Sequence, residues 1–498
     1  MKVKVEEGSI QEQTADTLIV NLFDDVTTPS GATGAVDAAL NGAISELIAS
    51  GDLTGKAGEI GVLYPRGAVP ATRVLVVGLG KREGFDLEGV RRAAGKAIQR
   101  ARELNAKQVA TIVHGAGVAG LPVTAAAQAT VEASLLALYE YDAPKQGRDE
   151  NKKAIESLTV VEFEAEKLAD IEAGVQTAEA IAAGVMIARD LVNMPPNVAT
   201  PTKMAKTAEK IAKRHNLNIT VGGRKWAKEH KMGGFLAVAK GAGEKPKFVV
   251  LEHNGDRDDL DTIVLVGKGI TFDTGGISIK PSQFMEAMKS DMGGAAAVLG
   301  AMEAVGALDL PLRVIGITPC TENMPDANAY RPADVITISN GKTVEIISTD
   351  AEGRMVLADG LVYARQYEPK AVIDLATLTG ACLVALGQGI AAGLFSTDDS
   401  LRDKLVAAGN GSFERVWPLP VWEEFKQLIR SDVADMKNSG GRFGGASTAA
   451  AFLKEFTDYP WVHLDIAGMA LSDKPGAYTP KGGTGYGVRL LVEFLRNW

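Results

Sequence analysis

Apolar runs in the first third of the chain alternate with helical patterns. Residues 17–22, 73–78 and 109–113 are short apolar stretches with the length and composition of buried strands. Between them, residues 87–104 repeat apolar side chains at the spacing of a helix. This alternation predicts that residues 1–165 form a self-contained N-terminal α/β domain.

Two segments are expected to connect this domain to the rest of the chain. Residues 142–158 are polar and charged, as is typical of an exposed inter-domain connection. The alanine-rich pattern over 171–192 predicts an amphipathic helix, which the prolines of N-M-P-P-N end because proline cannot continue helical hydrogen bonding. We assign residues 166–195 to a connecting helix and 196–498 to a second, larger domain.

The second domain mixes strand-helix alternation with one hairpin. Asn340-Gly341 lies between two alternating runs, which predicts a type I′ turn. Because a hairpin pairs antiparallel strands, we expect a mixed rather than an all-parallel central sheet. Strand-like segments cover 247–252, 262–266, 312–317, 371–378 and 462–466, and helical segments begin near 293 and cover 355–367 and 488–498.

The segment S-T-D-A-E-G-R, residues 348–354, carries charged side chains at alternate positions. Asp350, Glu352 and Arg354 are at i, i+2 and i+4, and in an extended backbone alternate side chains share one face. An apolar run precedes the segment and a helical pattern follows it, a setting where α/β enzymes often place their chemistry. Crowded carboxylates repel unless a proton or a cation lies between them, so the segment favours a metal site.

Composition indicates a globular protein of two domains. The chain has 498 residues, of which 46% are hydrophobic and 23% charged. We expect no membrane span and no secretory signal, because no long uncharged apolar stretch occurs and the chain begins M-K-V-K-V-E-E. The two cysteines, Cys320 and Cys382, are far apart, which suits the reducing cytoplasm. A net charge of −9 argues against a general nucleic-acid surface, and we expect no nucleic-acid partner.

Four acidic residues stand beside glycine or alanine, which would let the backbone approach an ion: Asp273, Asp291, Asp350 and Glu352. The five histidines are scattered and no HxxH, HExxH or CxxC occurs, so oxygen ligands would supply most of the coordination. Four carboxylates suit two divalent cations, a recurrent device for hydrolysis. The alternative is that these acids cap helices or lie in turns, and Asp291 precedes a predicted helix.

Two lysines flank the same acids, and their spacing leaves their roles open. Lys268 lies five residues before Asp273, and Lys280 seven residues after it. Either lysine could neutralise the carboxylates or stabilise a developing oxyanion. A deprotonated lysine could also bind a metal, which burial and a nearby dication promote.

A glycine-rich turn follows the predicted strand at 73–78. A dinucleotide-binding fingerprint needs G-x-G-x-x-G at the start of a helix. Here Gly78 and Gly80 are followed by a third glycine one place late, at Gly84. We favour a plain strand-to-loop turn over a nicotinamide site.

The motifs together resemble the leucyl aminopeptidase family, also called the cytosol aminopeptidases. The resemblance runs from about residue 190 to the C-terminus, whereas the first 165 residues match mainly by position. It is carried by T-D-A-E-G-R, by G-K-G-I-T-F-D-T-G-G-I-S-I-K-P at 267–281 and by K-S-D-M-G-G-A-A at 289–296. D-L-A-T-L-T-G-A at 374–381, H-L-D-I-A-G at 463–468 and P-K-G-G-T-G-Y-G-V-R at 480–489 extend it.

The resemblance implies a smaller, macro-domain-like N-terminal domain, a larger catalytic domain and two divalent metal ions, Mn²⁺ or Zn²⁺. Asp273 and Glu352 would bridge both ions. Lys268, as a neutral amine, and Asp291 would complete one site. Asp350 would complete the other site through its carboxylate and its backbone carbonyl.

The resemblance also implies catalytic and binding roles for other residues. Lys280 would stabilise the oxyanion, and Arg354 would hold a bicarbonate ion that serves as general base, because a guanidinium pairs with such an anion through two hydrogen bonds. The substrate side chain would contact Met288, Thr377, Gly380 and Ala467. The sequence departs from the family's usual pattern at Ser348, where asparagine is usual, and at Met355, where leucine is common.

We therefore expect a cytoplasmic aminopeptidase that uses a two-metal-activated hydroxide to remove Leu- or Met-like N-terminal residues from peptides. The family also implies a homohexamer. A two-metal phosphoesterase and a nucleic-acid-binding module that keeps the fold are the alternatives. We interpret His463, in an apolar strand, as a core histidine, and the basic run 224–231 as a solvated helix face.

Overall fold

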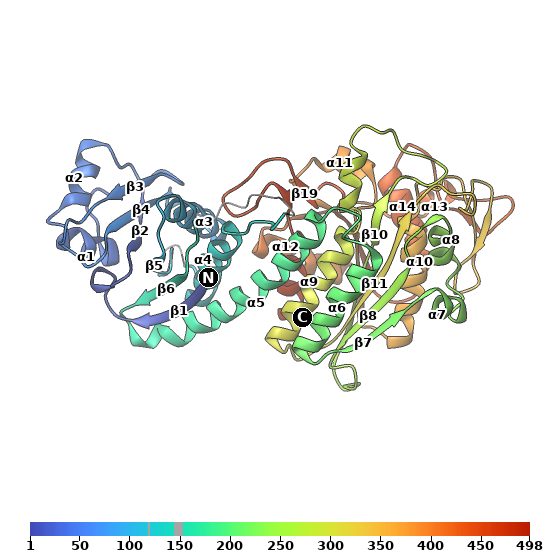
Figure 1. Ribbon diagram of the computed structural model, residues 1–498, viewed down its shortest axis with the longest axis horizontal. Helices are drawn as coiled ribbons and strands as arrows, with labels where there is room; N and C mark the ends of the chain where they lie inside the picture. The colour runs from blue at the N-terminus through green and yellow to red at the C-terminus, as the bar shows by residue number, and fades with distance from the viewer. Residues whose placement is uncertain (118–119, 144–152) are drawn as a thin grey trace. The chain divides into compact units, whose positions relative to one another are not determined.

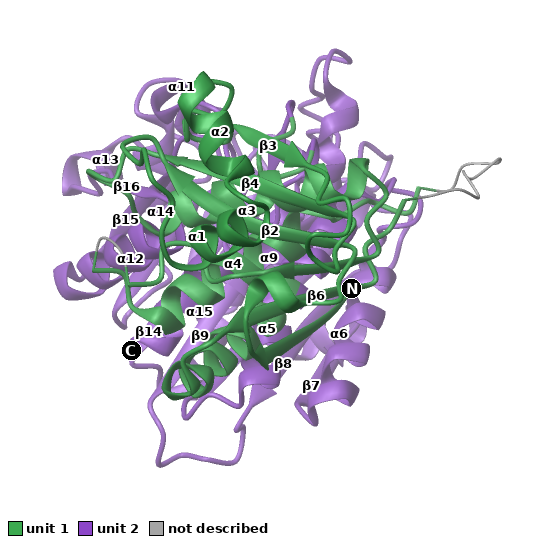
Figure 2. Ribbon diagram, turned by 90° about the vertical axis from the view of Figure 1, so that its left-hand side faces the viewer, with its two compact units in different colours: residues 1–182, 475–480 green, residues 183–474, 481–498 purple. Residues whose placement is uncertain are grey.

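The computed structural model describes residues 1–117, 120–143 and 153–498, and the chain divides into two compact units. The first unit comprises residues 1–182 and 475–480, and the second comprises 183–474 and 481–498 (Figure 2). The long helix α5 (Leu168–Asn193) contributes residues to both units.

The first unit is built on one six-stranded sheet with the strand order β1-β6-β5-β2-β4-β3 (Figure 1). Five strands run parallel, and only β3 is antiparallel, pairing with β4. The helices between parallel strands bury apolar side chains on both sheet faces, as expected of a parallel sheet. The elements are β1 (Lys2–Glu7), β2 (Thr17–Phe23), α1 (Gly31–Ala39), α2 (Ala43–Ser50), β3 (Ile60–Leu63), β4 (Arg73–Gly80), α3 (Leu87–Glu103), β5 (Gln108–Thr111), α4 (Val123–Ala137) and β6 (Ser157–Glu162).

The strands predicted at 17–22 and 73–78 and the helix predicted at 87–104 are confirmed by β2, β4 and α3. The strand predicted at 109–113 ends two residues earlier in the structure, where β5 stops at Thr111. The inter-domain connection predicted at 142–158 is wrong: β6 begins within it, at Ser157, and pairs with β1 and β5 of the first sheet. Residues 144–152 of that segment lie outside the described residues.

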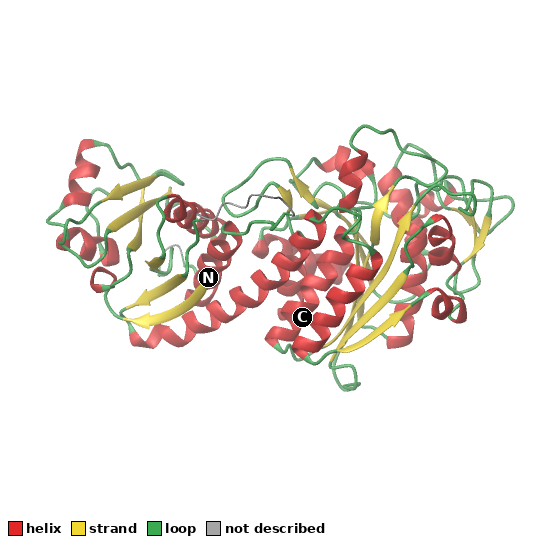
Figure 3. Cartoon of the chain, viewed as in Figure 1, coloured by secondary structure: helices red, strands yellow, loops and turns green. Residues whose placement is uncertain are grey.

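The second unit is organised around a nine-stranded mixed sheet (Figures 1 and 3). Its central strands β9, β11 and β14 are parallel neighbours, while β8 pairs antiparallel with β11 and β15 with β18. Helix α9 packs on these strands, and so does α10, with apolar side chains buried throughout. The strands are β7 (Asn218–Gly222), β8 (Lys247–His253), β9 (Thr262–Gly267), β10 (Gly269–Asp273), β11 (Arg313–Asn323), β14 (Ala371–Ala376), β15 (Ala392–Ser396), β16 (Val416–Pro418) and β18 (Trp461–Asp465).

The remaining elements of the second unit cover this sheet or form two small sheets. The small sheets consist of β12 (Val335–Thr337), β13 (Thr343–Glu345) and β17 (Met436–Lys437), and of β19 (Leu471–Ser472) and β20 (Gly482–Gly483). The helices are α6 (Pro201–His215), α7 (Arg224–Glu229), α8 (Gly233–Val238), α9 (Gly293–Leu308), α10 (Gly353–Ala364), α11 (Gly380–Leu386), α12 (Asp399–Ser412), α13 (Glu423–Gln427), α14 (Gly445–Lys454) and α15 (Val488–Arg496), with short 3-10 turns that include η4 (Met285–Ser290).

The predicted hairpin exists, but its turn is not type I′. Strands β12 and β13 pair antiparallel, yet only Gly341 of the two turn residues has a positive φ, 91°. Gly341 N donates to Ile338 O at 2.8 Å and Ile338 N donates to Lys342 O at 2.8 Å. This is a three-residue loop closed by a left-handed glycine, and it belongs to the small sheet rather than the central one.

Among the residues that the structure describes, two helical segments have the length and apolar character of membrane spans, Ala165–Asn193 and Met285–Leu308. Of the most apolar window in each, 61% and 83% respectively is buried inside the protein, which is how core helices of globular proteins also behave. Their apolar character is therefore accounted for by packing within the fold.

Candidate active site

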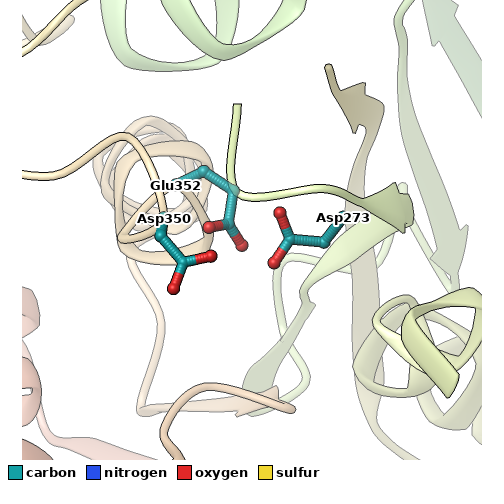
Figure 4. Close-up of side chains that lie close together, drawn as sticks. All are labelled: Asp273, Asp350 and Glu352. Carbon is teal, nitrogen blue, oxygen red and sulfur yellow. The ribbon is translucent and has the colours of Figure 1, made fainter. Parts of the chain in front are cut away.

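Three carboxylates converge where the loop after β10 meets the turn before α10. One oxygen from each of Asp273, Asp350 and Glu352 lies within 4.8 Å of the others (Figure 4). Asp273 and Glu352 are buried, and Asp350 is at the exposed side. Oxygen ligands crowded this closely fit a hard divalent cation.

The backbone that brings them together is not the extended one predicted. Residues 349–350 form a turn, and Glu352 has helical dihedrals (φ −76°, ψ −35°) directly before α10. Asp350 and Glu352 still converge, and their carboxylates lie beside that of Asp273 (Figure 4). Arg354 instead lies in the first turn of α10 and donates from Nη1 to Asn438 O at 2.8 Å.

Lys268 is the buried cation of the site. It follows β9, its side chain is 3% exposed, and its Nζ lies 2.8 Å from both Asp291 Oδ2 and Glu352 Oε1. Nζ also donates to Thr377 O at 3.0 Å. A Cβ on Gly353 would lie 2.5 Å from Lys268 Cε, so only glycine at 353 leaves room for this lysine.

Asp291 joins the site through Lys268 and Thr377. Its Oδ1 accepts a hydrogen bond from Thr377 Oγ1 at 2.7 Å. The helix-cap alternative for Asp291 is wrong, because α9 has Met292 at its N-cap with no side-chain cap hydrogen bond. Asp291 therefore belongs to the charge cluster, which it joins through its ion pair with Lys268.

Lys280 is the accessible cation of the site. Its side chain is 22% exposed, its Nζ lies 2.8 Å from Asp273 Oδ2, and it pairs closely with Asp350 Oδ1. The two lysines thus divide the carboxylates between them. Lys268 pairs with Asp291 and Glu352, whereas Lys280 pairs with Asp273 and Asp350.

The electrostatics of the cluster favour protonated groups. Burial lowers the pKa of Lys268, but Asp291, Glu352 and Asp273 more than offset this, so its pKa is raised. The pKa of Glu352 is raised by burial and by Asp273, against the opposing lysines. A cation entering the cluster would therefore meet protonated lysines, and ligation by Lys268 would release a proton.

Arg354 is a buried guanidinium with spare hydrogen-bonding capacity. The residue is 8% exposed, and its Nε is buried with no hydrogen-bond partner within the described part of the chain. Burial lowers the pKa of Arg354 to about 10, against the opposing effect of Glu352, Asp465 and Asp350. An unsatisfied buried N–H of this kind suits a small anion.

Three side chains that were not predicted as site residues fix these loops. Asn323, at the end of β11, donates from Nδ2 to Asp273 Oδ1 at 2.8 Å and to Thr349 O at 3.0 Å. Thr349 Oγ1 donates to Gly275 O at 2.6 Å and accepts from Ser278 N at 2.7 Å, which ties the two motifs together. No pattern in the sequence marks Asn323, because its partners are distant along the chain.

Asn438 is the third, and it holds the loop that carries Ser348. Its Oδ1 accepts from Ile347 N at 2.8 Å, and its Nδ2 donates to Ser348 O at 2.7 Å. Ser348 Oγ accepts from Asp350 N at 3.2 Å. The departure at Ser348 therefore places a hydroxyl that supports the backbone of a metal-ligand candidate, while Met355 is a fully buried core residue.

The residues predicted for the substrate pocket lie near the carboxyl ends of β14 and β18, apart from Met288 in η4. Asp465 organises this region, since its Oδ1 accepts from the backbone of Leu378, Thr379 and Ala467 at 3.2 to 3.3 Å. Its Oδ2 accepts from Thr379 Oγ1 at 2.6 Å. Half-buried Thr377 and Ala467 and exposed Gly380 are held in this framework.

Two interpretations away from the cluster are settled by packing. His463 is fully buried and its Nδ1 lies 2.6 Å from Asp374 Oδ1, as expected of a core histidine, although its Nε2 has no partner in the described residues. In the basic run, Trp226 packs on Phe248 and Tyr363. The tryptophan thus belongs to the fold, and the charged residues form the solvated face.

Comparison with known proteins connects this geometry to a family. The model described as "Cytosol aminopeptidase family, catalytic domain" matches residues 186–492, and that described as "Cytosol aminopeptidase family, N-terminal domain" matches residues 19–148. Curated relatives named "Probable cytosol aminopeptidase" include one from Roseiflexus castenholzii, 46% identical over 501 residues (100% of this chain, 99% of the relative). Another, from Alkaliphilus oremlandii, is 42% identical over 498 residues (100% and 99%).

Solved structures of similar proteins support the same family. A mutant of tomato leucine aminopeptidase has a TM-score of 0.88 and 35% identity, covering 100% of this chain and 97% of that one. The bottromycin maturation enzyme BotP in complex with Mn has a TM-score of 0.85 and 35% identity (97% and 99%). Nothing in these matches favours the phosphoesterase or the nucleic-acid-binding alternative. The chain belongs to the cytosol aminopeptidase family and is a metallo-exopeptidase, a hydrolase of peptides.

Proposed function

We propose that this enzyme is a cytoplasmic two-metal aminopeptidase that removes Leu- or Met-like N-terminal residues from peptides. The observation that carries the proposal is the convergence of Asp273, Asp350 and Glu352 within 4.8 Å, joined to Asp291 through Lys268. Two divalent ions, Mn²⁺ or Zn²⁺, would activate water and polarise the scissile carbonyl when bound.

The ligand assignment is the one that the resemblance to the family implies. Asp273 and Glu352 would be shared by both ions; both are buried, and they pair with different lysines, Lys280 and Lys268 respectively. Asp291 and Lys268 would complete the inner site, and Asp350 the outer one. Lys268 can serve as a neutral ligand only after losing its proton to solvent.

Lys280 would steady the oxyanion. It is the cation with the more exposed side chain, 22% against 3% for Lys268, so its ammonium can reach a substrate carbonyl without leaving the cluster. A fixed positive charge at that position stabilises negative charge as it develops in the transition state. The free α-amino group of the substrate would bind the metals, and because an internal peptide bond has no such group, cleavage would be restricted to the first residue.

Arg354 would hold bicarbonate through its buried, unpaired Nε. When bound, bicarbonate accepts and returns the proton that hydrolysis requires. Asp465 would set the shape of the pocket formed by Met288, Thr377, Gly380 and Ala467 by fixing the backbone of 378, 379 and 467.

The proposal is tested on protein stripped of metal and reconstituted with Mn²⁺ or Zn²⁺. We expect two ions per chain by elemental analysis and hydrolysis of Leu-p-nitroanilide and Met-p-nitroanilide in preference to Asp-p-nitroanilide. Cleavage of p-nitrophenyl phosphate alone, or full activity without added metal, would overturn it. Assembly as a homohexamer predicts a mass six times the 52.3 kDa of one chain by light scattering.

A further inference from the structure

The peptide bond between Thr349 and Asp350 is held at both ends. Its carbonyl, Thr349 O, accepts hydrogen bonds from Tyr330 OH at 2.9 Å and from Asn323 Nδ2 at 3.0 Å. Its amide, Asp350 N, donates to Ser348 Oγ at 3.2 Å. Because a peptide bond is planar, these three hydrogen bonds together fix the direction in which the chain enters Asp350.

Asp350 needs such support more than the other two converging carboxylates do. The side chains of Asp273 and Glu352 are 3% and 2% exposed, so packing restricts them, whereas the side chain of Asp350 is 39% exposed. Asp350 and Glu352 approach Asp273 from the turn before α10 (Figure 4). The position of the Asp350 carboxylate therefore depends on its backbone and on the ion pair with Lys280.

Tyr330 brings its hydroxyl to this peptide from a separate loop, between β11 and β12. It is 1% exposed, although residues 325–328 and 331–333 of the same loop are exposed. Its ring belongs to the same apolar core as Met355 of α10. Apolar packing fixes the ring, so the hydroxyl has a defined position from which it orients the Thr349 carbonyl.

The Tyr330 hydroxyl differs from the lysines of the cluster because it is neutral and bonds to a carbonyl. Lys268 and Lys280 pair with the carboxylate oxygens that a metal would bind, so a metal would compete with them. The hydrogen bond of Tyr330 involves none of those oxygens and can persist beside a bound metal. Burial raises the pKa of Tyr330 well above its ordinary value, and the three converging carboxylates raise it further, so the hydroxyl stays protonated and remains a donor.

We propose that Tyr330 is a positioning residue for Asp350 and, through it, for the outer metal site. Its hydroxyl keeps the peptide between Thr349 and Asp350 in the orientation that directs the Asp350 carboxylate toward Asp273 and Glu352. The inner site does not use Asp350, so it depends less on this hydroxyl. The proposal rests on the two-metal function proposed above.

The test compares Tyr330→Phe, which removes one hydroxyl and keeps the ring, with Tyr459→Phe as a matched control. Tyr459 OH donates to Leu361 O at 2.6 Å, a carbonyl of α10 with no ligand candidate next to it in sequence. Each full-length protein is stripped of metal and titrated with Mn²⁺ in competition with a chromophoric chelator. Asp350→Ala identifies the binding step that belongs to the outer site, because it removes the carboxylate of that site.

We expect the parent and Tyr459→Phe to bind two Mn²⁺ ions per chain with the same affinities. In Tyr330→Phe the outer step should weaken about tenfold, as loss of a group that orients a metal ligand does, and the inner step should change by less than about threefold. Saturating Mn²⁺ should restore kcat for Leu-p-nitroanilide to within about threefold of the parent, because no group proposed to contact the substrate has changed.

Unchanged affinities in Tyr330→Phe would overturn the proposal and leave the two-metal function intact. Equal weakening of both steps would also overturn it, since that would indicate a general distortion of the site. So would thermal unfolding of metal-free Tyr330→Phe far below that of Tyr459→Phe, measured by circular dichroism, because Tyr330 would then support the fold rather than the ligand. Binding of fewer than two ions by the parent would instead refute the two-metal function itself, and the outer site with it.

Discussion

The two large sheets present their carboxyl-end edges in different ways. In the second unit the edge holds six charged side chains, paired so that Lys268 and Lys280 each serve two carboxylates. In the first unit the edge holds an uncapped helix start and amide groups, and its four charged side chains, which sum to zero net charge, are all partly or fully exposed: Arg82, Glu162, Glu164 and Lys167. Buried charges need partners, so the charged edge depends on each member, whereas the neutral edge is stable when empty.

This contrast predicts the largest effect for the buried lysine. Lys268→Ala leaves Asp291 and Glu352 buried without their cation and should lower the free energy of unfolding of metal-free protein by about 3–5 kcal/mol. Urea denaturation measures this. Lys280→Ala is the matched control at a more accessible position and should cost clearly less; equal losses would show that burial does not divide the two lysines.

For catalysis the informative lysine is Lys280, because it is the one proposed to contact the substrate. Lys280→Ala should lower kcat about 10²–10³-fold, the loss typical of one oxyanion-stabilising group. Elemental analysis of the reconstituted variant should still find the metal content of the parent. If metal is lost along with activity, Lys280 is a ligand and the assigned role is wrong.

The stability of the first unit should depend on pH because of one buried histidine, His114. Burial lowers the pKa of His114 to about 4, below its ordinary 6.5, so the histidine is neutral in the folded protein. The unfolded chain takes up a proton first, and stability falls from pH 6.5 downward, by about 3 kcal/mol at pH 4.

Hydrogen exchange of β2 and β5 amides, corrected for the intrinsic effect of pH, reports this loss within the first unit. His114→Gln keeps an acceptor for Asn21, whose Nδ2 lies 3.1 Å from His114 Nδ1, but does not titrate, so the loss should be absent. The same decline in the variant would mean that other groups cause it.

A smaller effect is expected from the neutral side chain that orients the charged edge. Asn323→Ala removes the donor to Asp273 and should weaken metal affinity about 10–100-fold, as removal of residues that orient metal ligands does. Competition with a chromophoric chelator measures the affinity. Asn328→Ala, in the exposed loop that follows, is the control; an equal change in both variants would refute a specific role for Asn323.

The smallest effect should come from the departure at 348. Ser348→Asn restores the residue usual in the family, and the Asp350 amide keeps a side-chain oxygen nearby. We expect kcat/KM for Leu-p-nitroanilide to change by less than about threefold, because no charge or ligand is altered. A change of tenfold or more would show that the Ser348 hydroxyl itself sets the loop geometry.

The sequence was informative where chemistry is local. Asp350 and Glu352 belong to one short motif, and glycine-flanked Asp273 and Asp291 could be recognised beside it. The backbone conformation at Glu352 was misjudged, since an alternating pattern does not distinguish a strand from a turn that leads into a helix. The hairpin at 340–341 was found, but its turn type depends on φ values that Asn-Gly alone does not fix.

The features that could not be predicted involve residues that are far apart along the chain. Asn323, Asn438 and Asp465 act through hydrogen bonds to residues 26 to 91 positions away, and each looks like an ordinary polar residue in sequence. A cavity in the first unit is formed by five separate loops, and none of them carries a motif. Only the register of the strands brings such groups together.

The hydrogen bonds of Asn438 to Ser348 and Arg354 have a consequence for the synthesis of the enzyme. Ser348 and Arg354 are held by a residue that leaves the ribosome 84 to 90 positions later. At ordinary elongation rates that delay is about 5–20 s, during which the acidic loop of the nascent chain lacks its hydrogen bonds to Asn438. Peptidase activity should therefore appear only after Asn438 has emerged, so a chain interrupted before that point cannot digest its neighbours.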